Sequence, residues 1–405
     1  MPTEPSRFAV PFPPALSAGG DAAGEAGGAP APGLAAEAAI NADDALLAFV
    51  QQRVQPIPPA RSDAPVPLAG IIGATGVQQI QDAGAIVFHA VGDTGHGDHS
   101  PQSDVAAAMA GDYTLADPAH SPAFFLHLGD VIYGANKDAA YRDQFYVPYR
   151  QYPGKIVPIA GNHDGEVLAP TDPVSLRAFQ ANFCATSAEV PAVAGTVYRE
   201  TTTLPGVYWL LDAPFVQVVG LYSNVAENPG FLSGPVAGSV QKDWLVATLR
   251  AVGAARAAGT PGAPRKALIV VTHHPPFSSG GHAGSAAMLA DLDDACRQAG
   301  DVWPDLVFSA HAHNYQRYTR RVPVGDAAGG ATRTIPFLVA GGGGHGLSPV
   351  PAASGQVTGD HTFEASDAGY GYLVVRASTA EVRVDYYAVS GATKAARDSV
   401  TVALS

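Results

Sequence analysis

Cysteine and basic residues are scarce in this sequence. It has two cysteines, Cys184 and Cys296, and 23 lysines and arginines against 36 acidic residues. Two cysteines are too few for a disulfide framework; whether they pair is not decided by the sequence, and a buried free thiol is the default expectation for each. The formal net charge is −13 and no basic run is present. Because phosphate backbones and anionic membranes are bound through clustered Lys and Arg, we expect no nucleic-acid or membrane partner.

Long apolar runs are also missing. No run approaches the length of a membrane span, and the start Met1-Pro2-Thr3-Glu4-Pro5 lacks the basic end and the apolar core of a secretory signal. We therefore expect a soluble, cytoplasmic protein, with a secreted or periplasmic location left open. At 405 residues, 47% of them hydrophobic, the chain can bury the core of one large domain or two. The sequence makes no prediction of oligomeric state.

The first 84 residues differ in composition from the rest. Ala, Gly and Pro dominate up to about residue 35, which is typical of a tail or linker. Residues 36–54 have apolar positions at helical spacing, and prolines then break the pattern. Residues 60–84 are mixed and end in a turn signal. We therefore divide the chain into an N-terminal extension with one helix, residues 1–84, and a main domain, residues 85–405.

From residue 85 onward, short apolar runs are each followed by a cluster of polar residues. Open α/β sheets place their ligands at the carboxyl ends of strands, so these clusters are positioned for chemistry. The five pairs of run and cluster are 86–91 with Gly92-Asp93-Thr94-Gly95, 123–128 with Gly129-Asp130, 156–160 with Gly161-Asn162-His163-Asp164, 267–271 with Thr272-His273-His274-Pro275-Pro276, and 306–309 with Ala310-His311-Ala312-His313.

Other patterns complete a mixed α/β fold. Residues 105–110, 240–257 and 286–299 have helical spacing. Residues 207–211 and 215–221 flank a turn and predict an antiparallel pair. Near the C-terminus, three alternating runs predict strands that extend a sheet without adding catalytic residues; they are 336–340, 370–377 and 381–390.

The polar clusters contain a mixed set of oxygen and nitrogen ligands. Such a set suits iron, manganese or zinc rather than calcium or a structural thiolate site, and it is large enough for two ions. Two ions about 3.5–4 Å apart need a bridging carboxylate, and Asp130 is the natural bridge. By strand alternation, His273 should point away from the site. The candidate ligands are Asp93, Asp130, Tyr133, Asn162, His274, His311 and His313.

Each cluster has another interpretation when taken alone. Gly-Asp pairs are common turns, and an Asp after a strand often caps the next helix, so Asp93 and Asp130 carry little weight singly. His311 and His313 could lie on one face of a strand as ordinary polar residues. Five such clusters in one chain, each after an apolar run, favour a binuclear metal site over coincidence.

Together the five clusters resemble the five-block signature of the calcineurin-like metallophosphoesterase superfamily, and most of all its purple acid phosphatase branch. The resemblance covers residues 86 to about 318 and, with the trailing strands, extends to about 390. It implies a four-layer αββα sandwich of two mixed β-sheets flanked by helices. The first block has Asp93-Thr94-Gly95 where most of the superfamily has Asp-x-His. Tyr133 is the obvious substitute for the missing histidine, which separates this branch from the others.

The resemblance also implies how the ligands divide between two metal ions. The first ion, typically Fe(III), would be held by Asp93, Asp130, Tyr133 and His313. The second, Fe(II), Zn or Mn, would be held by Asp130, Asn162, His274 and His311.

The implied activity is hydrolysis of small phosphate monoesters, of the acid phosphatase type, with a metal-bound hydroxide as the nucleophile. His163 matches a non-ligand histidine that contacts the phosphoryl oxygens. His282 lies about where the branch often has a histidine that protonates the leaving group. A phosphodiesterase on the same fold, acting on cyclic nucleotides or other diesters, is the alternative. A non-catalytic binding module would be expected to have lost ligands, and none is missing from the sequence.

Overall fold

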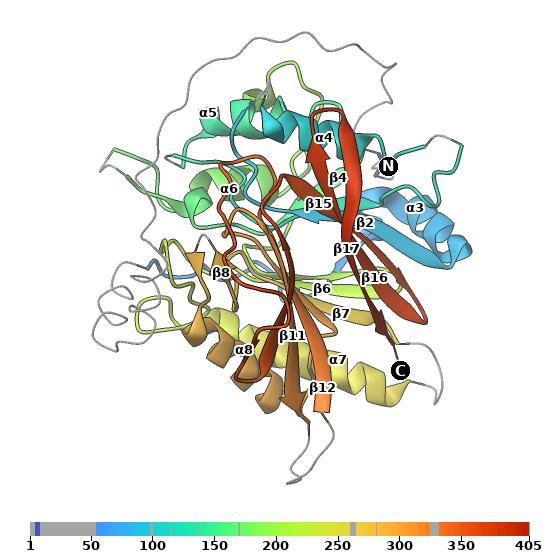
Figure 1. The fold of residues 1–405 in the computed structure, drawn as a ribbon. Coiled ribbons are helices and arrows are strands. Elements are labelled where there is room, and N and C mark those ends of the chain that lie inside the picture. Colours follow the sequence, from blue (N-terminus) through green and yellow to red (C-terminus); the bar gives the residue numbers. More distant parts are fainter. Residues whose placement is uncertain are drawn as a thin grey trace.

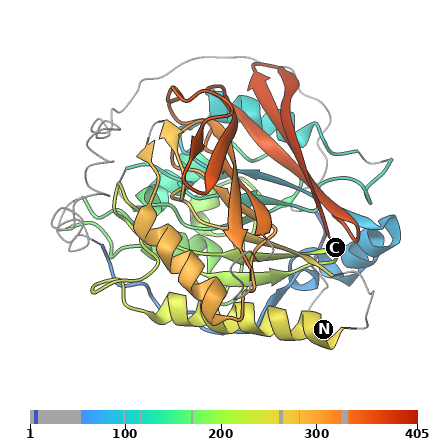
Figure 2. The ribbon, with the colours of Figure 1, turned by 60° about the horizontal axis from the view of Figure 1, so that its bottom comes forward.

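Two mixed β-sheets with helices on their outer sides make up the protein (Figure 1; Figure 2). The computed structural model describes residues 5–8, 54–97, 100–114, 116–134, 136–168, 171–259, 265–280, 282–324 and 332–404. The predicted fold class is confirmed. The helix predicted over 36–54 lies outside the described residues, apart from its last residue.

The larger sheet has nine strands. Its middle strands β6, β7, β10 and β12 run parallel to one another, and β11 and β14 add an antiparallel edge. The predicted pair at 207–221 is confirmed as antiparallel β5 and β6. In spatial order the strands are β1 (Val66–Pro67), β5 (Trp209–Asp212), β6 (Val216–Gly220), β7 (Ala267–Val271), β10 (Leu306–Ser309), β12 (Thr332–Ala340), β11 (Tyr315–Pro323), β14 (His361–Asp367) and β13 (Val357–Thr358).

The smaller sheet has six strands, of which β2, β3 and β4 are parallel and the C-terminal strands are antiparallel. In spatial order they are β17 (Thr393–Ala403), β16 (Glu381–Ser390), β15 (Gly371–Ser378), β2 (Ala85–Val91), β3 (Phe124–His127) and β4 (Lys155–Pro158). A separate hairpin pairs β8 (Ser279–Gly280) with β9 (His282–Ala283).

Longer helices cover the sheets, and short ones lie in the connections. Helices α3 and α4 contact the smaller sheet, and α7 packs beside α8 on the larger one (Figure 1). The helices predicted at 105–110, 240–257 and 286–299 are confirmed as α4, α7 and α8. The helices are α3 (Ala69–Ala83), α4 (Pro101–Ala110), α5 (Asp138–Tyr141), α6 (Arg177–Phe183), α7 (Val240–Ala258) and α8 (Ala286–Gln298), with short turns η1 (Arg142–Tyr146), η2 (His163–Gly165) and η3 (Ala192–Ala194).

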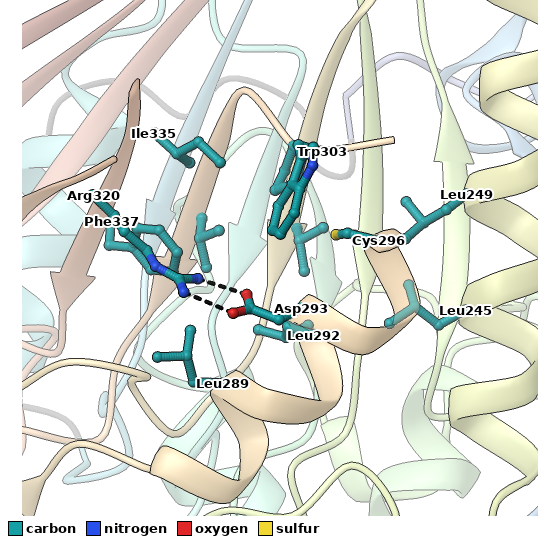
Figure 3. A pocket seen from close by; sticks show the side chains of 13 residues that line it. Leu245, Leu249, Leu289, Leu292, Asp293, Cys296, Trp303, Arg320, Ile335 and Phe337 are labelled. Atoms are coloured by element: carbon teal, nitrogen blue, oxygen red, sulfur yellow. Dashed lines mark hydrogen bonds and ion pairs between the residues drawn. The ribbon is translucent and has the colours of Figure 1, made fainter. Parts of the chain in front are cut away.

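Helices α7 and α8 pack against the larger sheet through an ordinary apolar core. Leucines from both helices face strands of the larger sheet around a small apolar cavity (Figure 3). Arg320 closes one side through a two-pronged ion pair with Asp293 at 2.6 and 2.7 Å. Cys296 lines this cavity, and it and Cys184 are both buried free thiols, as expected. Among the described residues, no helix is long and apolar enough to cross a membrane.

Candidate metal centre

The carboxyl ends of five strands meet between the two sheets. Within the smaller sheet, the Asp93 amide donates to Gly129 O at 3.0 Å; within the larger, the Ala310 amide donates to His273 O at 2.9 Å. Two bonds cross between the sheets: the Gly92 amide donates to Ala340 O at 2.9 Å, and His273 Nδ1 lies 2.9 Å from Leu128 O. These hydrogen bonds join four of the polar clusters, and the fifth is tied to them by the His163 amide, which donates to Asp130 Oδ1 at 3.0 Å.

Four of the candidate residues have an unusual backbone conformation. The φ angles are 55° at Asp93, 52° at Asp130, 66° at His311 and 50° at His313. A residue with a Cβ pays roughly 1–2 kcal/mol to occupy this left-handed region. Strain of this kind persists where the surrounding structure enforces it, and it is concentrated at functional sites.

Apart from His163 Nδ1, which faces Glu166, five buried atoms of ligand type at this place have no well-aligned hydrogen bond among the described residues. Two of the five, Asp130 Oδ2 and His273 Nε2, face each other at 3.2 Å. An unsatisfied buried polar atom costs about 1–3 kcal/mol, so a cluster of them requires an explanation, and a bound cation supplies one. Carboxylate, amide and imidazole atoms suit iron, zinc or manganese, so the donors fit the implied metals. The five atoms are Asp93 Oδ2, Asp130 Oδ2, Asn162 Oδ1, His273 Nε2 and His311 Nε2.

The structure corrects the choice between the two adjacent histidines. His273 Nε2 lies 3.2 Å from Asp130 Oδ2 and 3.7 Å from Asp93 Oδ1, so His273 points into the site. In contrast, His274 has both ring nitrogens engaged, Nδ1 with Ser223 Oγ and Nε2 with Ala226 O, each at 2.8 Å. The prediction that His274 faces the metals was wrong. Strand β7 ends at Val271, so alternation does not extend to these residues.

Tyr133 reaches the site opposite His273. Its phenol oxygen lies 3.4 Å from Asp93 Oδ1 and 3.2 Å from His313 Nε2. Its ring stacks on His345 with the centroids 3.5 Å apart. His345 follows a glycine run, and a Cβ on Gly341 would overlap Asp93 Oδ2, which explains why glycine is needed there. Tyr133 thus lies beside two of the residues that the resemblance groups with it, Asp93 and His313.

His163 lies at the edge of the site. Its amide donates to Asp130 Oδ1 at 3.0 Å, and its Nδ1 lies 2.9 Å from Glu166 Oε2. Burial opposes the charged form, but Asp130, Glu166 and Glu227 outweigh it and raise the pKa of His163 to about 10. His163 is therefore a cation at neutral pH and is suited to contact an anionic group.

The imidazoles of His311 and His313 have the opposite character. At His273, in contrast, burial is outweighed by Asp130 and Asp93, which raise its pKa to about 9. Burial, followed by the neighbouring histidines, lowers the pKa of His311 well below its ordinary value. Burial, followed by His345, lowers the pKa of His313 to about 3. Both rings are therefore neutral at neutral pH, the form in which imidazole binds metal ions.

His282 comes from the β9 strand and packs on the ligand histidines. Its ring stacks on His311 with the centroids 4.1 Å apart and lies 5.8 Å from that of His313. The structure thus brings His282 into the site, at the side where Glu227 also lies.

Comparison with known proteins identifies the family. The model of the calcineurin-like phosphoesterase family matches residues 86–315, more than half of the chain. The chain belongs to this family.

Solved structures of two proteins show the same fold as this phosphoesterase. The purple acid phosphatase PPD1 from yellow lupin (Lupinus luteus) seeds has a TM-score of 0.53 at 17% identity, over 79% of this chain and 54% of the lupin chain. GAP50, the anchor in the inner membrane complex of Plasmodium, has a TM-score of 0.52 at 12% identity, over 79% of this chain and 89% of that one. The match thus spans about half the length of the lupin enzyme. No curated protein matches the sequence.

The phosphoesterase site contains two acidic residues that sequence reasoning missed, Glu166 and Glu227. Glu166 pairs with His163, and Asn162 Nδ2 donates to Glu227 Oε2 at 3.3 Å. Glu166 lies three residues after His163, a spacing that could have drawn attention to it. Glu227 lies in an irregular loop, and no sequence signal pointed to it.

Gly161 is required by the same phosphoesterase site, and its replacement has a definite expected result. A Cβ there would overlap Asp130 Oδ1 and the Asp130 backbone nitrogen. We expect Gly161→Ala to cost about 1–3 kcal/mol of stability and to weaken metal binding about 10- to 100-fold. Thermal unfolding and metal titration measure both. Gly70→Ala is the control because its nearest neighbour would be 3.8 Å away; it should leave metal binding unchanged and, as a Gly-to-Ala change within helix α3, should not lower stability.

Proposed function

We propose that this phosphoesterase hydrolyses small phosphate monoesters in the manner of purple acid phosphatases. The observation that carries the proposal is the convergence of unsatisfied carboxylate, amide and imidazole atoms at a place where Tyr133 stands beside Asp93 and His313. A phenol in that position replaces the first-block histidine that most of the superfamily has.

Two metal ions fit the donors present. Asp93, Tyr133 and His313 would hold the first, Asn162, His273 and His311 the second, and Asp130 would contribute to both. We propose Fe(III) for the first site, because a phenolate and carboxylates are hard oxygen ligands, and Fe(II), Zn or Mn for the second. When bound, such a pair supplies positive charge for the phosphoryl oxygens and activates water for attack.

The remaining groups of the chain bind the substrate and move a proton. His163 is cationic and partly exposed, so its Nε2 can donate a hydrogen bond to a phosphoryl oxygen. His282 is buried beside the ligands and can give a proton to the departing alkoxide oxygen. Since water attacks phosphorus directly, no covalent phosphoenzyme is needed.

A phosphodiesterase is the second candidate, and the acidic residues favour it. Glu166 and Glu227 place negative charge next to His163, which disfavours a dianionic monoester relative to a monoanionic diester. Rates on p-nitrophenyl phosphate and bis(p-nitrophenyl) phosphate, measured on protein loaded with iron and zinc, separate the two candidates. We expect faster turnover of the monoester. Protein that holds two metals and hydrolyses neither ester would contradict both proposals.

Tyr133 gives the proposal a visible signature. Coordination of a phenolate to Fe(III) produces a charge-transfer band in the visible spectrum, so the iron-loaded protein should be coloured. We expect Tyr133→Phe to abolish the band. The control is Tyr141→Phe, which should keep the band, because Tyr141 is a buried tyrosine whose hydroxyl donates to Asp164 instead. An absorption spectrum of each iron-loaded variant is sufficient. A wild-type protein that is active, loaded with Fe(III) and colourless would exclude Tyr133 as a ligand.

A further inference from the structure

The proposed mechanism gives the Glu227 carboxylate no role, although it lies at the site. It lies in the loop after β6, and its side chain is 38% exposed. Oε2 accepts a hydrogen bond from Asn162 Nδ2 at 3.3 Å and lies 3.9 Å from His163 Nε2. Oε1 lies 3.9 Å from His282 Nε2. Glu227 therefore stands on the solvent side of the site, between the two histidines assigned to the substrate.

The negative charge of Glu227 is poorly neutralised. Among the described residues, no lysine or arginine forms an ion pair with it; the ring nitrogens of His163 and His282 both lie 3.9 Å from its oxygens. His163 also faces Glu166 at 2.9 Å and Asp130 at 4.0 Å, so three carboxylates share this one imidazole. Glu227 thus places a negative charge at the partly exposed side of the site, where the substrate would approach.

The position of His282 indicates which part of the substrate lies next to Glu227. A residue that protonates the leaving oxygen must lie next to that oxygen, so the alcohol attached to it emerges beside His282. Because the Glu227 carboxylate lies 3.9 Å from His282 Nε2, a charged substituent a few bonds beyond the ester oxygen comes within ion-pair distance of Glu227. The phosphoryl group itself would bind at the proposed metal ligands.

We propose that Glu227 selects phosphate esters whose alcohol carries a positive charge, such as esters of amino or quaternary ammonium alcohols. This inference rests on the phosphoesterase activity proposed above and names the substrate class of that site. Glu227 attracts the cationic end of such an ester and repels an alcohol that carries a carboxylate. Attraction and repulsion therefore both contribute to the preference for cationic esters.

A matched series of monoesters tests the inference. Ethanolamine phosphate has a cationic alcohol, propyl phosphate a neutral one, and phosphoglycolate an anionic one. In the wild type we expect kcat/KM to fall in that order. In Glu227→Gln, the ratio of cationic to anionic ester should fall by about tenfold, because the variant removes one charge close to the substituent and keeps the shape. Glu189→Gln removes an exposed charge elsewhere and should leave the ratio unchanged.

A binding measurement gives the same information without turnover. Calorimetric titration of the metal-loaded protein with 2-aminoethylphosphonate and with phosphonoacetate should show tighter binding of the amine, and Glu227→Gln should reduce this preference by a similar factor. Equal preferences in wild type and Glu227→Gln, with propyl phosphate still hydrolysed, would overturn the inference and leave the proposed function standing. If the metal-loaded wild type hydrolyses none of the three esters, the proposed function falls and the inference falls with it.

Discussion

Asp130→Asn is expected to abolish metal binding and to reduce turnover by about a thousandfold or more. Asp130 is fully buried, its Oδ1 accepts the His163 amide at 3.0 Å, and its Oδ2 has no hydrogen-bond partner. Burial opposes ionisation, but His273 and His163 outweigh it and lower the pKa of Asp130. Asn keeps the size of the side chain and removes the charge that would contribute to both metal sites. Elemental analysis and kcat/KM measure the two effects.

The control for Asp130→Asn is Asp294→Asn. The side chain of Asp294 is 47% exposed and pairs with Lys242, and an ion pair near the surface contributes little. Both variants lose one carboxylate, so a change in overall charge cannot explain a difference between them. An Asp130→Asn protein that keeps two metals per chain and full rate would contradict the site.

His273→Ala is expected to affect metal binding and His274→Ala to affect stability, although the two residues are adjacent. His273→Ala removes an imidazole nitrogen that points at Asp130, so metal content should fall and turnover should drop about a hundredfold or more. His274→Ala leaves Ser223 Oγ and Ala226 O without their partner, so it should cost about 1–3 kcal/mol of stability while the folded protein still binds metal.

Metal titration and thermal unfolding of both variants separate these effects. Since each variant is the natural control for the other, the comparison does not depend on absolute rates. The opposite result would be a His274→Ala protein that unfolds at the wild-type temperature yet binds no metal, together with a His273→Ala protein that binds two ions. That result would support His274 as the metal ligand, as predicted from the sequence.

The location of the site could be predicted from the sequence because a small number of physical rules determines it. Short apolar runs such as 86–91 and 267–271, each followed by a polar cluster, favour buried strands, and parallel strands present their carboxyl ends at a common edge. Asp93, Asp130 and Asn162 follow such ends directly, so their convergence did not depend on details of the loops. The positive φ angles at Asp93 and Asp130 were not foreseen, because non-glycine residues rarely adopt them.

Side-chain direction beyond a strand end was less predictable. After Val271 the chain turns, and Thr272 Oγ1 donates to His274 O at 2.9 Å, so the period of two no longer applies. Glu227 was missed because only the three-dimensional path of its loop brings it to Asn162. Helix α3 was missed because glycines within 69–83 weaken its helical pattern, and Gly73 has a non-helical conformation.

The number of metal ions bound per chain, followed together with phosphatase activity as metal is added back to stripped protein, tests the central claim most directly. The account predicts two ions per chain, with activity that appears only as the second site fills, and neither in Asp130→Asn. Full activity in protein that holds no metal, or wild-type protein that binds no metal at saturation, would contradict it.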